Sequence, residues 1–81
     1  MKRYNKATRV LVDFDTLGQA SPVFFIASCG ERAKVSRVIS VAEERWGYKS
    51  FIRFRIEFNG RNAELCWDRS NDRWFLTKEG A

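Results

Sequence analysis

The feature that most constrains the fold is an alternating segment, residues 51–58, that runs directly into Asn59-Gly60. Apolar side chains occupy every second position of this segment, which is the pattern of a strand with one buried face. Asn-Gly readily supplies the two positive φ angles of a type I′ turn, so the sequence predicts a hairpin with a two-residue loop. Its register sets these residues opposite each other: Ile52 and Trp67, Phe54 and Leu65, Arg55 and Glu64, Ile56 and Ala63.

A third strand is predicted over residues 73–78, after a turn at residues 69–72. Pairing Asp68 with Arg73 places Trp67 beside Trp74, and it places Leu65 beside Leu76 in the same way. The third strand then extends the apolar face of the hairpin. Residues 51–78 are therefore predicted to form a three-stranded meander.

The N-terminal half is less regular. Strands are predicted over residues 9–14, over 23–28 after Pro22, and over 32–41. The last of these needs a β-bulge near Ser36-Arg37, because Val35 and Val38 cannot share a face of a regular strand. The segment 42–50 is expected to hold one helical turn or a loop.

About six short antiparallel strands predict an all-β fold. Aromatic residues make up 15% of the chain, and a small, strongly bent sheet or SH3-like barrel would bury them. A flatter sheet covered by residues 42–50 is the alternative. We expect one β-domain over residues 9–79.

The net charge of +5 is concentrated at the N-terminus, where Lys2, Arg3, Lys6 and Arg9 supply four positive charges. The rest of the chain is nearly balanced. We therefore expect residues 1–8 to form a flexible basic tail.

A set of positions across residues 10–78 resembles a bacterial family of small all-β domains of unknown function. The set comprises Val12–Gly18, Pro22, Phe24, Gly30, Val35, Val38, Trp46, Arg53–Arg55, Glu64, Leu65, Asp68 and Arg73–Leu76. The resemblance implies a β-fold and, because relatives are encoded near DNA-repair polymerases, it adds weight to nucleic-acid binding.

The sequence offers little catalytic chemistry. It has no histidine, the commonest general base and metal ligand. Asp13 and Asp15 lie two apart on a predicted strand and could hold Mg²⁺, but an Asx-type turn at Asp15 with a solvated Asp13 is favoured. No cofactor and no metal site is predicted.

Two cysteines, Cys29 and Cys66, are too far apart in sequence for a metal motif. With no signal peptide or membrane-spanning run, we expect a cytoplasmic protein with free thiols and no membrane partner. Cys66 falls opposite Arg53, whose charge could make the thiol reactive. A small, half-buried filler residue is the favoured interpretation.

The outer face of the meander gathers arginines and aromatic side chains. The candidate binding face comprises Phe51, Arg53, Arg55, Arg73 and Phe75. Such a face can hold single-stranded nucleic acid by stacking and phosphate contacts. In the alternative, the Phe side chains pack under other segments while the arginines pair with acidic residues.

Three functional classes remain. The favoured one is a small non-catalytic interaction or accessory module that binds another protein. The alternative is a domain that binds single-stranded DNA or RNA through the Arg/Phe face. An enzyme is the least favoured class.

Overall fold

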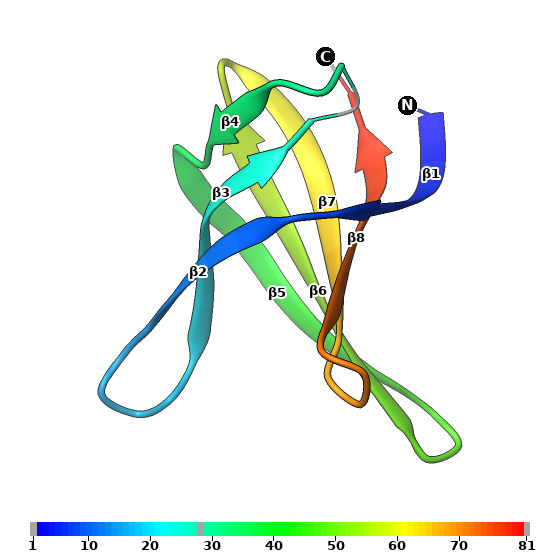
Figure 1. Ribbon diagram of the computed structural model, residues 1–81. Coiled ribbons are helices and arrows are strands. Elements are labelled where there is room, and N and C mark those ends of the chain that lie inside the picture. The colour runs from blue at the N-terminus through cyan, green and yellow to red at the C-terminus, as the bar shows by residue number, and fades with distance from the viewer. Residues whose placement is uncertain (1, 28, 81) are drawn as a thin grey trace.

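The computed structural model describes residues 2–27 and 29–80. These residues form eight strands in two antiparallel sheets, with no helix among them (Figure 1). The strands are β1 (Lys2–Thr8), β2 (Val10–Phe14), β3 (Ala20–Ile26), β4 (Arg32–Lys34), β5 (Arg37–Trp46), β6 (Lys49–Phe58), β7 (Arg61–Asp68) and β8 (Arg73–Glu79). The larger sheet has the order β1-β8-β7-β6-β5, and the smaller has the order β2-β3-β4. The prediction of an all-β domain is confirmed.

The predicted meander is β6-β7-β8, and its register is confirmed. Phe54 lies opposite Leu65, which in turn lies opposite Leu76. Asn59 and Gly60 have φ angles of 48° and 72°, as a type I′ turn requires. The turn and the apolar alternation each specify the same register, which is why this part follows from local sequence alone.

The chain passes from the smaller to the larger sheet between β4 and β5. The Val35 N–H donates to the Val23 carbonyl in the smaller sheet, and the Ser36 N–H donates to the Glu57 carbonyl in the larger one. The single bulged strand predicted over residues 32–41 is therefore two strands. The register irregularity lies between Val38 and Ser40, not near Ser36-Arg37.

Residues 42–50 are neither a helical turn nor a loop, so both of those predictions are wrong. They form the end of β5, a tight turn and the start of β6, with Trp46 opposite Lys49. Gly47 has a φ of 63° within the turn. The segment extends the larger sheet at its edge instead of covering it, which removes the alternative of a sheet covered by residues 42–50.

The backbone of residues 2–8 lies along β8 as β1, with Thr8 opposite Trp74. The flexibility that the sequence predicts for a basic tail over residues 1–8 stays a prediction. Without β1, β8 would end the sheet with a row of unpaired backbone groups. Pairing of the backbone needs no apolar pattern, and the sequence carries none there.

The core lies between the two sheets. Its fully buried large side chains are Phe25, Phe54, Ile56, Leu65 and Leu76. Phe25 of the smaller sheet meets Phe58 of the larger one edge to face, with 5.0 Å between ring centroids. The ladders of the described residues leave the two sheets unclosed, so the bent-sheet form of the prediction holds in place of a closed SH3-like barrel.

Candidate functional site

The five residues of the predicted Arg/Phe face do share one face of the larger sheet. Arg53 lies opposite Cys66, which lies opposite Phe75. In the neighbouring row, Asp68 lies between Phe51 and Arg73. The remaining member, Arg55, lies opposite Glu64, as the hairpin register predicts. A hollow of about 380 Å³ on this face is bordered by Phe51, Arg53 and Phe75.

The guanidinium of Arg53 is already engaged by carboxylates. Its Nη2 lies 3.2 Å from Glu44 Oε2, and its Nη1 lies 3.7 Å from Glu64 Oε1. Its Nε is buried and has no hydrogen-bond partner. Glu64 is only 7% exposed and also accepts a 2.9 Å hydrogen bond from Thr77 Oγ1. The centre of the Arg/Phe face is therefore an internally paired charge network.

Two arginines of this face remain open to solvent. Arg55 and Arg73 are exposed, and neither makes an ion pair within residues 8–27 and 29–80. Phe51 and Phe75 are half-buried beside them. Only the outer parts of the face are thus free to contact a phosphate or a base.

Cys66 lies in this face but is buried, with 8% of its surface exposed. Burial raises the pKa of its thiol, and the opposing influence of Arg53 is smaller. The thiol is therefore held neutral, which favours the filler interpretation over a reactive nucleophile. Cys29 is a free and exposed cysteine at a turn.

The Asx-type turn predicted at Asp15 is present. Asp15 Oδ1 accepts hydrogen bonds from the N–H groups of Leu17 and Gln19, both at 2.9 Å. Asp13 is exposed on β2. Across residues 2–27 and 29–80, no three His, Cys, Asp or Glu side chains are grouped as metal ligands would be.

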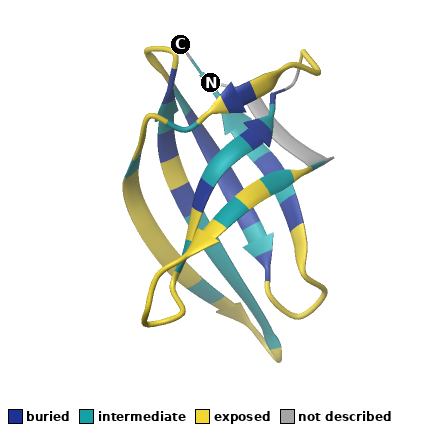
Figure 2. Ribbon diagram, turned by 60° about the vertical axis from the view of Figure 1, so that its left-hand side comes forward, coloured by how far each residue is buried: buried dark blue, intermediate teal, exposed yellow. Residues whose placement is uncertain are grey.

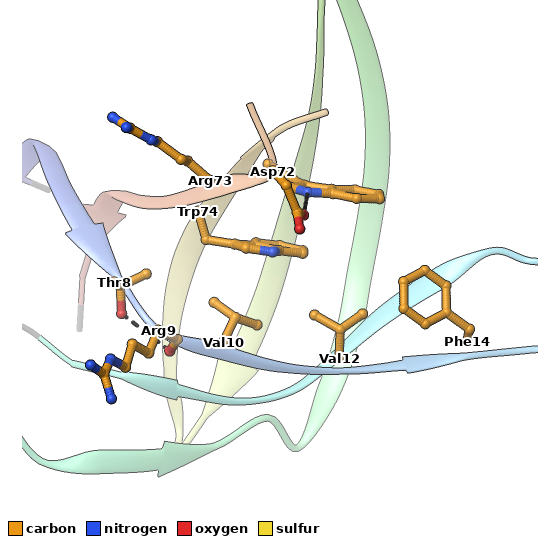
Figure 3. Close-up of a pocket in the computed structure, with 9 residues that line it drawn as sticks. Thr8, Arg9, Val10, Val12, Phe14, Asp72, Arg73 and Trp74 are labelled. Carbon is orange, nitrogen blue, oxygen red and sulfur yellow. Dashed lines mark hydrogen bonds between the residues drawn. The ribbon is translucent and has the colours of Figure 1, made fainter. Parts of the chain in front are cut away.

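A second site was not predicted: a hollow of about 700 Å³ between β2 and the β7–β8 hairpin, which we call the β8-side hollow. Figure 3 shows Val10 and Val12 projecting from β2 toward Trp74, with Phe14 farther along the same side of the strand. Arg9, Asp72 and Arg73 complete its lining together with Thr8 and Trp67. Phe14 remains 57% exposed, so the hollow opens to solvent along an apolar wall.

The tryptophan pair opposite β2 is fixed by the β7–β8 turn. Trp67 and Trp74 stack with 5.4 Å between ring centroids and 4° between ring planes. The Trp67 indole N–H donates to Asp72 Oδ1 at 3.0 Å. Asn71 donates through its side chain to Asp68 Oδ2 at 3.0 Å, which lowers the pKa of that carboxyl. The stacked rings therefore present an apolar surface, and the polar edge of Trp67 is already bonded.

The other wall is held by Thr8, where the chain enters β2. Its hydroxyl donates to the Ile26 carbonyl at 2.9 Å and accepts from the Ile26 N–H at 3.2 Å. These bonds anchor the start of β2 to the end of β3. Beyond them, the β2–β3 hairpin projects away from the larger sheet (Figure 1), leaving Phe14 without cover.

The sequence contains one signal of this site, because the strand predicted over residues 9–14 sets Val10, Val12 and Phe14 on one side. Val10 and Val12 do pack against the core, whereas Phe14 extends past it. The overhang depends on where the two sheets meet, which no local pattern specifies.

Comparison with family models, with curated proteins and with solved structures gives no match. Among the described residues, no helix has the length and apolar character needed to cross a membrane.

Proposed function

We propose that this protein is a non-catalytic interaction module that binds another protein, and that it takes an apolar side chain of the partner into the β8-side hollow. The observation that carries the proposal is the exposed apolar wall of that hollow. Phe14 is 57% exposed and lines the same hollow as the stacked rings of Trp67 and Trp74. Exposed apolar surface gathered in a concavity is typical of a binding site.

The energy available in the hollow suits a modest affinity. Burying one side chain of the size of Leu or Phe is worth about 1.5–3 kcal/mol. A micromolar complex needs about 8 kcal/mol, so the anchor must be accompanied by further contacts. The charged side chains at the hollow, Arg9, Asp72 and Arg73, can supply polar contacts around a central apolar anchor.

The chemistry of the candidate nucleophile and carboxylates supports a non-catalytic role. The raised pKa of Cys66 disfavours its thiolate. The carboxylate of Asp15 accepts two backbone hydrogen bonds that shape a turn. The Cys66 thiol and the Asp15 carboxylate thus have structural roles, which supports a non-catalytic function.

Single-stranded nucleic acid is the second candidate ligand. Exposed Arg55 and Arg73 flank half-buried Phe51 and Phe75, an arrangement that allows phosphate contacts beside a stacking ring. The pairing of Arg53 with Glu44 and Glu64 weighs against it, because a phosphate would have to compete with two carboxylates.

The test uses one pair of variants on the same strand. Leu11 and Phe14 of β2 are equally exposed, at 55% and 57%, but only Phe14 lines the β8-side hollow. Peptides of twelve residues would be selected from a random library on the unaltered protein and measured against Phe14→Ser and Leu11→Ser by fluorescence anisotropy. We expect the Phe14→Ser change to weaken binding by about tenfold or more, corresponding to about 1.4 kcal/mol, and Leu11→Ser to leave it unchanged.

Two results would contradict the proposal. One is a selection that yields no peptide weakened by Phe14→Ser. The other is micromolar binding of a twelve-nucleotide dT or rU oligomer that is lost in Phe75→Ala while peptide binding is absent. The second result would assign the protein to nucleic-acid binding.

We also propose a cytoplasmic location. The free state of Cys29 and Cys66 supports it, since disulfides form and persist mainly in oxidising compartments.

A further inference from the structure

β5 is an open edge of the larger sheet. It pairs with β6 on one side, and within the described part of the chain no ladder forms on its other side. Most of its ten residues are exposed, as the yellow stretches of Figure 2 reflect. Between Ser40 and Trp46 the register with β6 is regular. A long, regular edge presents a row of unpaired backbone N–H and C=O groups on which another strand can pair.

A second unpaired edge borders the same space. β4 is short and pairs only with Phe24, Phe25 and Ile26 of β3, so residues 20–22 at the start of β3 pair with β2 alone. Ala20 and Ser21 line one side of a hollow of about 310 Å³, and Val38 and Val41 line the other. The gap between β3 and β5 is therefore bordered by strand edges on both sides.

The gap continues along β5 as a second hollow of about 440 Å³. We call the two together the β5 groove. Phe54 and Val41 line both parts, and Ile52 lines the second. Val41 is 58% exposed although it belongs to the row of Phe54, Leu65 and Leu76. The floor of the groove is thus apolar core surface that the smaller sheet leaves uncovered.

The charge of the groove has the opposite sign to that of the chain. Its titratable side chains are Asp13, Asp15, Glu43 and Arg69, whereas the whole protein carries a net +5. One of the three carboxylates, Glu43, lies 3.5 Å from the guanidinium of exposed Arg45, and Asp13 and Asp15 make no ion pair within residues 8–27 and 29–80. Three carboxylates beside an apolar floor favour a ligand that brings positive charge between apolar side chains.

From these observations we propose that an extended segment of a partner protein, alternating apolar and basic residues, adds to β5 as a new strand within the β5 groove. Main-chain hydrogen bonds to the edge would provide affinity, and alternate side chains would meet the apolar floor. The inference rests on the proposed function in taking the ligand to be a protein, but it assigns a different surface and a defined ligand chemistry.

A second copy of this chain fits the groove less well. Pairing two β5 edges would bring a second Glu43 to a groove already bordered by Glu43, Asp13 and Asp15, and the Arg45 that each copy brings is already paired with its own Glu43. Charged residues on an edge strand oppose such self-pairing through repulsion of like charges. A basic partner relieves that repulsion.

The test uses labelled eight-residue peptides. The first alternates Val and Lys, the second alternates Val and Glu, and the third has the composition of the first in two blocks. We expect the Val–Lys peptide to bind at least tenfold more tightly than the other two. Its affinity should fall several-fold in Glu43→Gln, and it should be unchanged in the control Glu31→Gln, an exposed residue outside the groove.

Backbone methylation separates strand addition from charge attraction. An added strand uses the N–H groups of only one of its edges, and these belong to every second residue. N-methylation of one alternating set of peptide residues should therefore abolish binding, whereas N-methylation of the other set should spare it. Hydrogen exchange should slow at alternate amides of residues 40–46 when the peptide binds. Strand addition would be overturned if both methylated peptides lost affinity equally or if neither lost affinity. It would also be overturned if the β5 amides gained no protection from hydrogen exchange.

The two proposals fail in distinguishable ways. Phe14→Ser should leave the Val–Lys peptide bound, because Phe14 lies outside the β5 groove. If library peptides lose affinity in Phe14→Ser while the Val–Lys peptide does not bind, the proposed function stands and the strand addition is wrong. Protection of β5 amides that rises with protein concentration in the absence of peptide would assign the edge to a second copy and overturn the basic partner.

Discussion

At the scale of single residues, Glu64 is a side chain whose burial departs from the solvent exposure that the alternating sequence pattern predicts for it. It occurs on the solvent-facing side of an amphipathic hairpin, yet only 7% of it is exposed. The hairpin register places it opposite Arg55, but its ion pairs are with Arg53 and Lys78, both at 3.7 Å. Thr77 provides a hydrogen bond. A carboxylate with this many partners is costly to replace.

Replacing Glu64 by Gln should therefore destabilise the protein more than the same change at Glu57. Glu57 pairs with Arg37 at 3.4 Å, and both of these side chains are substantially exposed. We expect a loss of about 1–3 kcal/mol for Glu64→Gln and less than about 1 kcal/mol for Glu57→Gln. Urea unfolding of the two variants checks this, and equal losses would show that the Glu64 network adds nothing beyond a surface pair.

The two thiols should differ in reactivity and in their effect on stability. Cys29 is exposed and should react with a disulfide reagent promptly, whereas Cys66, buried with a raised pKa, should react only when the protein opens. In the unfolded chain the Cys66 pKa returns toward 9.0, so the unfolded state loses its proton first. The free energy of unfolding should then decline as the pH rises above 9.0.

A Cys66→Ala variant provides the control, because it should lose this part of the alkaline decline while Cys29→Ser keeps it. Prompt reaction of two thiols per folded chain would contradict the burial of Cys66.

At the scale of elements, the outcome of sequence analysis depended on whether a strand has one buried face. β6 and β8 bury one face more than the other, and β7 sets Ala63 and Leu65 on the apolar face, so the period-two pattern and the Asn59-Gly60 turn were sufficient to predict pairing. β5 is exposed over most of both faces, which leaves no alternation to detect around the turn at Gly47. β1 pairs through its backbone with β8 and likewise leaves no apolar pattern. The strand that sequence reasoning missed in residues 42–46 therefore belongs to an edge of the larger sheet.

The turn between β6 and β7 allows a clean measurement of backbone strain. A Cβ atom on Gly60 would have no heavy atom within 4 Å, and the φ of Gly60 is 72°. Gly60→Val should destabilise by about 1 kcal/mol or more through strain alone. Gly60→Asn should cost clearly less, because Asn tolerates positive φ. Thermal unfolding compares them, and equal melting temperatures would argue against the type I′ turn.

At the scale of the whole molecule, two sheets meet at one end and diverge at the other. Phe25 and Phe58 join them where the core is dense, and the β2–β3 hairpin leaves the larger sheet beyond that point (Figure 1). The sequence predicted the all-β class and placed the Arg/Phe residues on one face. It could not predict the β8-side hollow, because the overhang of Phe14 beside Trp67 and Trp74 depends on contacts between distant segments.

The divergence of the sheets also explains why the binding surfaces proposed here lie on either side of one hairpin. The β8-side hollow is lined by Val12 and Phe14, and the β5 groove by Asp13 and Asp15. Successive residues of a strand point to opposite sides, so one hairpin supplies an apolar wall to the first surface and an acidic border to the second.

The three tryptophans permit the most direct test of the account. Trp67 and Trp74 line the β8-side hollow, and Trp67 also borders the β5 groove. Trp46 borders the Arg/Phe face together with Phe51 and Phe75. The measurement is the NMR shift of each indole N–H on titration with a library-selected peptide, with signals assigned from a Trp46→Phe variant. We predict that the Trp67 and Trp74 signals shift and that the Trp46 signal stays in place. A shift of Trp46 alone, of only one of the other two signals, or of none of the three would contradict the assignment of the β8-side hollow as the binding site.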